Sequence, residues 1–316
     1  MIRWGHTRIH PEFGRRLRKH IRRRGPVILV ALLLCWMAAV RARETVEAPV
    51  LVVLALSAGA AWAVWGISCL KEGVWLGAAA HDMTWSAHRR SLVRTRPDET
   101  DESSAFLIGQ MVRVEQRVAE FVTETAMAGV TLALRGGRIG SWREARSTRT
   151  GEHGHVDLGY GWLEPGRSAA LPYILEHELA HLRRQDSRNR LLVDAITVTA
   201  ASLCAGQLPL ADAALALCGI GVGWVAYQWW GELACDRAAT SRCGRQTAID
   251  CWRQELEGER AVPPLTRWGL SLLGLISHPP TRLRLWVSCW PPSGAGSVAE
   301  ESPCGGVVER MPPQNN

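Results

Sequence analysis

The chain has 316 residues, of which 47% are hydrophobic and 21% charged, and its formal net charge is +7. None of the nine cysteines belongs to a Cys-x-x-Cys pair, which argues against a disulfide framework and against a zinc ribbon. Fifteen tryptophans accompany three tyrosines and three phenylalanines, and tryptophan is typical of the boundary between membrane and water. The composition therefore favours a membrane protein over a water-soluble one.

Residues 1–25 form a strongly basic arm in which Glu12 is the single acidic residue. A basic segment can bind nucleic acid, but this one leads directly into an apolar run, which favours a role in membrane topology. We therefore expect a cytoplasmic arm and no nucleic-acid partner.

Two apolar runs follow, at 26–40 and 48–70, separated by a short turn in which the charges balance. The first run is shorter than the about 20 residues that a membrane span needs, but flanking arginines can reach toward the headgroups. A cleaved signal peptide has the same basic-then-apolar layout, but the long arm and the nearby second run favour a hairpin. We predict that residues 26–70 form a two-span transmembrane hairpin with both ends in the cytoplasm.

Residues 71–190 mix charged and apolar positions and are predicted to form the first part of a catalytic domain. Apolar residues at helical spacing predict a helix around 107–121, and β-branched and apolar residues predict strands at 130–135 and 155–158. A further helix is predicted over 173–184, which has no glycine or proline and starts near a proline.

The segment His-Glu-Leu-Ala-His at 177–181 carries the strongest functional signal in the sequence. Histidines four residues apart project from one face of a helix, so we predict that His177 and His181 hold one Zn²⁺. Glu178 then lies beside the open coordination position and acts as general base on a metal-activated water. The alternative is a surface helix with two solvated histidines, but the apolar residues around the motif predict burial.

The remainder of the chain divides into three parts. Residues 191–230 contain two apolar stretches and are predicted to form a second hairpin that spans the membrane; a pair of buried helices in a soluble core is the alternative. Residues 231–290 are predicted to complete the catalytic domain. Residues 291–316 are rich in proline, glycine and serine and are predicted to be disordered.

A catalytic zinc site needs a third protein ligand, and a later helix is its expected source. Residues 232–236 read Glu-Leu-Ala-Cys-Asp, with two acidic residues one helical turn apart. We predict that Glu232 is the ligand and that Asp236 accepts a hydrogen bond from the outer N–H of a ligating histidine. Such acidic pairs are common on exposed helix faces, but the position directly after the apolar hairpin favours a ligand.

These segments together resemble the HtpX-like and CAAX prenyl protease family of membrane zinc endopeptidases. The resemblance covers most of the chain. It includes the basic arm, the two N-terminal spans and the pair of apolar stretches at 191–230. It also includes three motifs: His-Glu-Leu-Ala-His-Leu-Arg-Arg-Gln-Asp ending at Asp186, the segment 232–236, and Ser-His-Pro-Pro-Thr-Arg-Leu-Arg at 277–284. In that family a late His-Pro-Pro followed by an arginine lies near the active site. The resemblance implies that His278 and Arg284 steady the substrate or the developing oxyanion. A helix-start role is the alternative for His278.

The chain also has some resemblance to the BlaR and MecR type of membrane sensor protease. Those proteins share the form His-Glu-Leu-Ala-His-Leu-Arg-Arg, and Glu-Leu-Ala-Cys-Asp is closer to their pattern. The stretch between His181 and Glu232 is also shorter than is usual for the HtpX-like family. Sensor proteases normally carry a receptor region outside the cell, however, and no C-terminal segment here is large enough to fold as one. That difference and the late His-Pro-Pro favour the HtpX-like interpretation.

The sequence thus predicts a mainly α-helical integral membrane protein with a zincin-like (gluzincin) catalytic domain that includes a small β-sheet. We expect a multi-pass zinc metalloendopeptidase of the inner membrane whose catalytic domain faces the cytoplasm and binds one Zn²⁺ per chain. Its expected partners are the lipid bilayer and polypeptide substrates, including misfolded or membrane proteins. A regulatory sensor protease that cleaves a repressor and an inactive membrane scaffold are the alternatives. Glu178 argues against the scaffold, because a structural zinc site has no use for a base.

Overall fold

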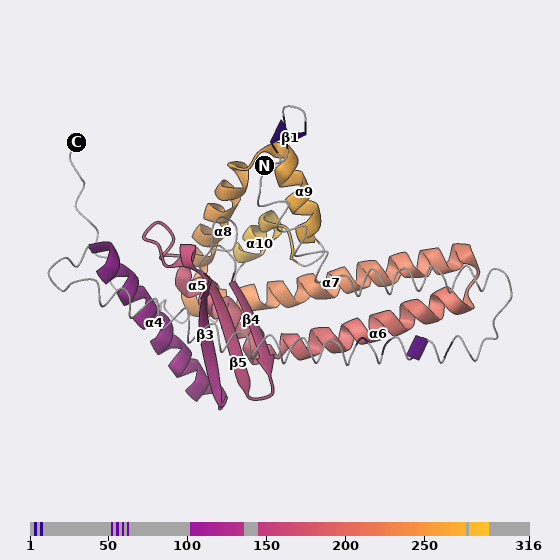
Figure 1. Ribbon diagram of the computed structural model, residues 1–316, viewed down its shortest axis with the longest axis horizontal. Coiled ribbons are helices and arrows are strands. Elements are labelled where there is room, and N and C mark those ends of the chain that lie inside the picture. The colour runs from indigo at the N-terminus through magenta and orange to yellow at the C-terminus, as the bar shows by residue number, and fades with distance from the viewer. Residues whose placement is uncertain are drawn as a thin grey trace.

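The computed structural model describes residues 102–135, 145–275 and 278–290, and the isolated positions 3–4, 7–8, 52, 55–56, 59 and 62. This part of the chain is mostly helical and contains a small three-stranded sheet, as the sequence predicts (Figure 1). The isolated positions include a two-stranded ribbon of β1 (Arg3–Trp4) and β2 (Thr7–Arg8). Otherwise the predictions for the arm, the first hairpin and the tail lie outside the described residues.

The three-stranded sheet has the strand order β3–β5–β4. Its strands are β3 (Gly129–Arg135), β4 (Ala145–Thr150) and β5 (His153–Gly159). β3 runs parallel to β5, and β4 runs antiparallel to β5 across a tight turn in which Gly151 has a φ of +60°. The two predicted strands are confirmed as β3 and β5. β4 was not predicted, because Ala-Arg-Ser-Thr-Arg-Thr has no alternation of apolar and polar residues.

The main hydrophobic core lies between the sheet and two helices, α4 (Glu102–Thr125) and α5 (Leu171–Arg184). Apolar residues of α4 recur at helical spacing and form one stripe. This stripe is buried together with side chains of the sheet and of α5: Met111, Val114, Val118, Phe121, Leu132, Leu134, Val156, Leu158, Ile174, Leu175, Leu179 and Leu182. The His-Glu-Leu-Ala-His segment therefore lies on a helix that the core holds in place.

Two long helices, α6 (Asp186–Gln207) and α7 (Leu210–Cys243), form an antiparallel hairpin that extends away from the sheet (Figure 1). α6 begins directly after α5, where Gln185 takes a left-handed φ of 57° and turns the chain. α7 continues through residues 230 and 231 without interruption. The predicted boundary between the apolar hairpin and the second part of the catalytic domain therefore falls inside one helix.

The hairpin exposes much apolar surface. Among the described residues, α7 is the one helix that is long and apolar enough to cross a membrane, and 6% of its most apolar window is buried. Large apolar side chains on both helices are exposed: Leu192, Ile196, Leu210, Leu215 and Val222. Apolar surface of this extent is rare on water-soluble monomers and marks contact with another apolar surface or phase.

Three shorter helices complete the described chain: α8 (Arg245–Arg260), α9 (Pro264–Leu275) and α10 (Thr281–Ser288). Gly244, with a φ of +85°, ends α7 and lets the chain turn into α8. Trp252 of α8 packs edge-on against Tyr173 of α5, with ring centroids 5.8 Å apart. α10 packs against both α7 and α8, which brings Arg284 close to α5 and α7.

Candidate metal centre

The two histidines of the motif lie one turn apart on α5 and point toward the same place. The Nε2 atoms of His177 and His181 are 3.1 Å apart, and the two rings meet edge to face. This arrangement follows from the spacing of four residues on a helix. Because zinc binds imidazole nitrogen at about 2.0–2.1 Å, one ion placed between these atoms can reach both.

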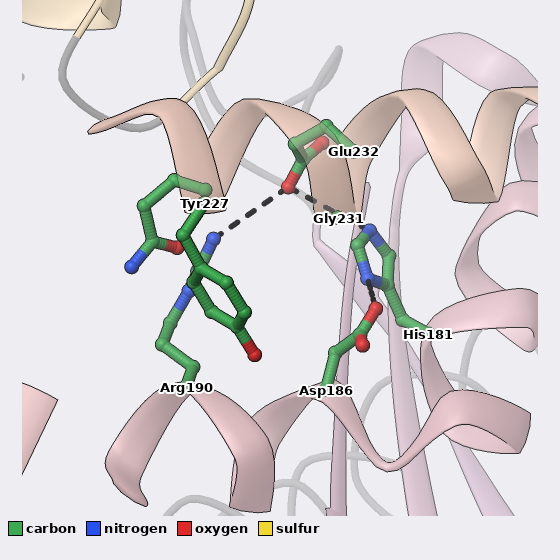
Figure 2. Close-up of a pocket in the computed structure, with 7 residues that line it drawn as sticks. His181, Asp186, Arg190, Tyr227, Gly231 and Glu232 are labelled. Carbon is green, nitrogen blue, oxygen red and sulfur yellow. Dashed lines mark hydrogen bonds and ion pairs between the residues drawn. The ribbon is translucent and has the colours of Figure 1, made fainter. Parts of the chain in front are cut away.

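The carboxylate of Glu232 reaches this place from α7 (Figure 2). Its Oε2 lies 3.5 Å from Nε2 of His177, and its Oε1 lies 3.7 Å from Nε2 of His181. Ligand atoms of all three residues lie within 4.8 Å of one another. Glu232 is 3% exposed, and a buried carboxylate is costly unless positive charge compensates it. This buried group of side chains is therefore suited to hold a metal cation.

Each of the two histidines is oriented by a carboxylate that lies next to its Nδ1 atom. Nδ1 of His177 lies 2.9 Å from Oδ1 of Asp236. Nδ1 of His181 lies 2.7 Å from Oδ2 of Asp186. When Nδ1–H donates to the carboxylate, the Nε2 lone pair of each ring is left for a metal. Asp236 was predicted for this position but Asp186 was not, because its contact depends on the left-handed turn at Gln185 that follows α5.

Arg284 of α10 binds both carboxylate oxygens of Asp236, and its Nη2 also lies 3.4 Å from Nδ1 of His177. Its Nη2 and Nε atoms donate to Oδ1 and Oδ2 at 2.6 and 2.7 Å, and its guanidinium carbon lies 3.8 Å from the centroid of the Trp252 ring. Burial lowers the pKa of Arg284, but the charge of Asp236 outweighs it and holds the pKa above its ordinary value, so the pair stays ionised. Arg284 therefore binds the same carboxylate that orients the His177 ring.

His278 lies in the short link before α10. Its Nδ1 is 3.0 Å from Oε2 of Glu232, and most of its side chain is exposed. His278 thus approaches Glu232 from the solvent side, whereas the two histidines of α5 approach it from the interior. Both residues implied by the family resemblance lie next to the predicted metal ligands.

Glu178 is buried on α5 and is bound by β4. The hydroxyl of Ser147 donates a hydrogen bond of 2.8 Å to Oε2 of Glu178. Ser147 was not predicted, and its polar strand carries no sequence signal for this contact. The hydrogen bond orients the carboxylate and leaves Oε1 for another partner.

His177 has a perturbed pKa. Burial lowers this pKa, but the hydrogen bond and charge of Asp236, together with a hydrogen bond to Glu232, raise it to about 9. Without a metal the ring therefore carries a proton at neutral pH, and this charge offsets the carboxylates around it. A metal ion that binds here has to displace the proton.

A second group of donor atoms, from His181, Asp186 and Cys235, also lies within 4.8 Å. The thiol of Cys235 is 3.3 Å from Nδ1 of His181 and donates to Oδ2 of Asp186 at 3.4 Å. This group uses the ring nitrogen that already donates to Asp186. The group built on Nε2 and Glu232 is therefore the better metal site. Cys235 was not predicted to be near the site, although it stands between the two acidic residues of the Glu-Leu-Ala-Cys-Asp segment.

No protein-family model, curated protein or solved structure matches this chain. The chemistry of the donor atoms is then the guide to function. Two imidazole nitrogens and one carboxylate oxygen are one of the donor sets that zinc takes in catalytic sites with three protein ligands, and outer carboxylates commonly orient such histidines. The residues present fit a zinc ion.

Proposed function

We propose that this chain is a membrane-bound zinc endopeptidase of the HtpX-like type. One observation supports the proposal most: Nε2 of His177 and Nε2 of His181 lie 3.1 Å apart and face the buried carboxylate of Glu232. Three protein ligands leave a coordination position open, which is the arrangement of catalytic zinc sites, whereas structural sites close all four positions. This difference argues against an inactive scaffold.

Zinc, when bound, supplies a Lewis acid and lowers the pKa of water to near neutrality. The proton released from water has to be taken up, and Glu178 is the residue placed to accept it. Ser147 holds Oε2 of this carboxylate at 2.8 Å, so Oε1 accepts the proton and later returns it to the nitrogen of the leaving amine. Peptide hydrolysis then proceeds without a covalent intermediate.

His278 and Arg284 have different roles in this proposal. The exposed imidazole of His278 faces the site and steadies the substrate or the negative charge that develops on its carbonyl oxygen. Arg284 acts through Asp236, since its Nε and Nη2 atoms both donate to that carboxylate. Arg284 is therefore a positioning residue for His177.

The position of β4 supports a polypeptide substrate. In the described sheet β4 is an edge strand that pairs on one side with β5, and it carries the Ser147 that contacts Glu178. An extended peptide can add to such an edge through backbone hydrogen bonds. A chain bound there passes next to the proposed general base.

The α6–α7 hairpin supports the membrane part of the proposal. The apolar window of α7 is long enough to cross a bilayer and is largely exposed, and α6 exposes further large apolar side chains beside it. The basic arm predicted at residues 1–25 favours a catalytic domain on the cytoplasmic side. A site at the base of this hairpin favours substrates that are themselves close to the membrane.

The test is to measure zinc content and proteolysis in the full-length protein purified in detergent. We expect one zinc per chain in the wild type, and its loss in His177→Ala and Glu232→Ala. Glu178→Gln should retain the zinc and lower the rate of casein hydrolysis by about 10²–10⁴-fold, the usual contribution of a general base. Glu257→Gln, at an exposed position on α8, is the matched control and should behave as the wild type.

Three results would contradict the proposal. Zinc bound without any hydrolysis of unfolded protein would favour the scaffold, and full activity of Glu178→Gln would reject its role as the base. Zinc that is indifferent to Glu232→Ala would reject the ligand set.

A further inference from the structure

A pocket lies beside the candidate metal centre, between α6 and α7 (Figure 2). His181 and Glu232 form one side of it, so a molecule in the pocket lies next to the metal position. Gly231 and Asp186, whose carboxylate is bound by His181 and Arg184, belong to the same lining. Arg190 of α6 and Tyr227 and Gln228 of α7 line the remainder. The metal ligands and the proposed general base do not include any of these three residues, so they are available for another purpose.

Gln228 indicates that the pocket takes a polar ligand. The residue is 3% exposed, and neither Nε2 nor Oε1 of its amide has a hydrogen-bond partner among the described residues. A buried amide without partners is costly, and native proteins rarely keep one without a reason. A ligand that offers both a donor and an acceptor, as a peptide group does, satisfies both ends of this amide.

Arg190 indicates the charge of the ligand. Its Nη2 lies 3.7 Å from Oε1 of Glu232, its one carboxylate partner among the described residues, and its side chain is 45% exposed. Once Glu232 binds a divalent cation, its charge is directed to the metal. The lining of the pocket then includes a guanidinium and a cation, and it attracts an anion. Carboxylates match the fork of an arginine through two parallel hydrogen bonds.

We propose that this pocket binds a carboxylate of the substrate next to the scissile bond, with Arg190 pairing with the carboxylate and Gln228 hydrogen-bonding the adjoining peptide group. The inference rests on the proposed peptidase function and adds a substrate class to it. The carboxylate belongs either to an acidic side chain or to the C-terminus of the chain that is cut. Arg190 and Gln228 thereby determine specificity.

The experiment measures binding without turnover. The full-length protein carries Glu178→Gln, is loaded with zinc in detergent, and is titrated by calorimetry with four small probes. N-acetylglutamate has both carboxylates, its α-amide has the side-chain carboxylate alone, N-acetylglutamine has the terminal carboxylate alone, and N-acetylglutamine amide has neither. The middle two probes distinguish an acidic side chain from a chain terminus.

We expect N-acetylglutamate and one of the singly charged probes to bind at least about tenfold more tightly than the uncharged probe, the effect of one charge-assisted pair. Arg190→Gln should remove this preference and leave the zinc content unchanged. Arg188→Gln, also exposed on α6 but outside the pocket, is the control and should retain the preference. Gln228→Leu should weaken binding without lowering the melting temperature, because it removes an amide that the protein itself leaves unpaired.

Equal binding of the charged and uncharged probes, or a preference that survives Arg190→Gln, overturns the proposal. Tighter binding of inorganic phosphate than of N-acetylglutamate also overturns it and assigns the pocket to a lipid headgroup. Zinc content and casein hydrolysis are measured on the wild type in parallel. Failure of the peptidase function is therefore seen separately from failure of the carboxylate pocket.

Discussion

The two halves of α7 have opposite surroundings. Leu215 and Val222 in the first half are 76% and 70% exposed, whereas Glu232 and Asp236 in the second half are buried. A helix of a water-soluble protein buries its apolar side chains and exposes its charged ones. The exposed apolar side chains of the first half and the two buried carboxylates of the second reverse this rule, although they belong to one uninterrupted helix.

The difference lies in what surrounds each half. Histidines of α5 and an arginine of α10 surround the charged half and compensate its two carboxylates. The apolar half is largely exposed among the described residues and calls for contact with another apolar surface or phase instead. The comparison indicates that the two halves of this helix suit two environments: a polar protein interior and, as we propose, a bilayer. Four predictions test the contrast, from the largest expected effect to the smallest.

Asp236→Ala should have the largest effect, because it leaves the largely buried Arg284 without the carboxylate that it binds and His177 without the acceptor of its Nδ1–H. We expect a loss of about 3–5 kcal/mol in the free energy of unfolding and a zinc affinity lower by about 10–100-fold. Chemical denaturation and zinc titration measure the two effects. The double variant with Arg284→Met should recover stability but not zinc affinity. A single variant as stable as the wild type would contradict the buried network.

Val222→Arg tests the apolar half of the helix. A charge in the middle of a membrane span costs about 2.5–3.5 kcal/mol, whereas an exposed valine of a soluble protein tolerates it. We expect less of the variant to resist extraction from membranes by alkaline carbonate. Glu257→Arg on α8 is the control and should fractionate as the wild type does. Unchanged extraction of Val222→Arg would mean that this half does not face lipid.

The pH dependence of zinc binding tests the charged half. Below the raised pKa of His177, about 9, each bound zinc releases one proton from this ring. The apparent zinc affinity should therefore rise by about tenfold per pH unit toward pH 9. The metal-free protein should show the opposite trend: a raised pKa in the folded state adds stability below the ordinary value of 6.5, and this stability is lost as the pH rises through 9. Zinc titrations and denaturation curves between pH 6 and 9 check both signs.

Glu124→Gln should have the smallest effect. Arg242, near the end of α7, donates to this carboxylate at 2.9 Å and lowers the pKa of Glu124 to about 2. A lowered pKa adds stability above the ordinary value of 4.5 and loses it as the pH falls toward 2. Since the pair is exposed, we expect a loss of at most about 1 kcal/mol near neutral pH, and less at pH 2 or in high salt. Denaturation curves compared with the exposed control Glu152→Gln measure it.

Part of the site was predictable because its geometry is local. A spacing of four residues on a helix brings His177 and His181 together whatever the rest of the fold does. Glu232 could be predicted as a ligand from the sequence only because an apolar hairpin separates it from the motif and returns the chain to α5. The hydropathy pattern predicted that the hairpin ends near residue 230. Helical backbone hydrogen bonding continues beyond that point, however, and α7 ends at Cys243.

The unpredicted contacts depend on features that composition and spacing do not encode. Ser147 reaches Glu178 from a strand that lacks an apolar face. Asp186 reaches His181 because Gln185 adopts a left-handed conformation, in which residues other than glycine are uncommon. Arg190 and Gln228 line one pocket only because α6 and α7 pack side by side. Such contacts follow from tertiary packing and require the fold.

The continuity of α7 has a mechanical consequence. The helix contains no proline between Val222 and Glu232, which are ten residues apart, so it behaves as a stiff rod over a distance of roughly 15 Å. The thickness of a bilayer sets the tilt and depth of the segment within it. A change in tilt would move the Glu232 carboxylate relative to His177 and His181, because the core fixes the helix that carries these histidines. In the proposed membrane protein, the stiffness of one helix thereby links the surrounding lipid to the geometry of a proposed metal ligand three turns away.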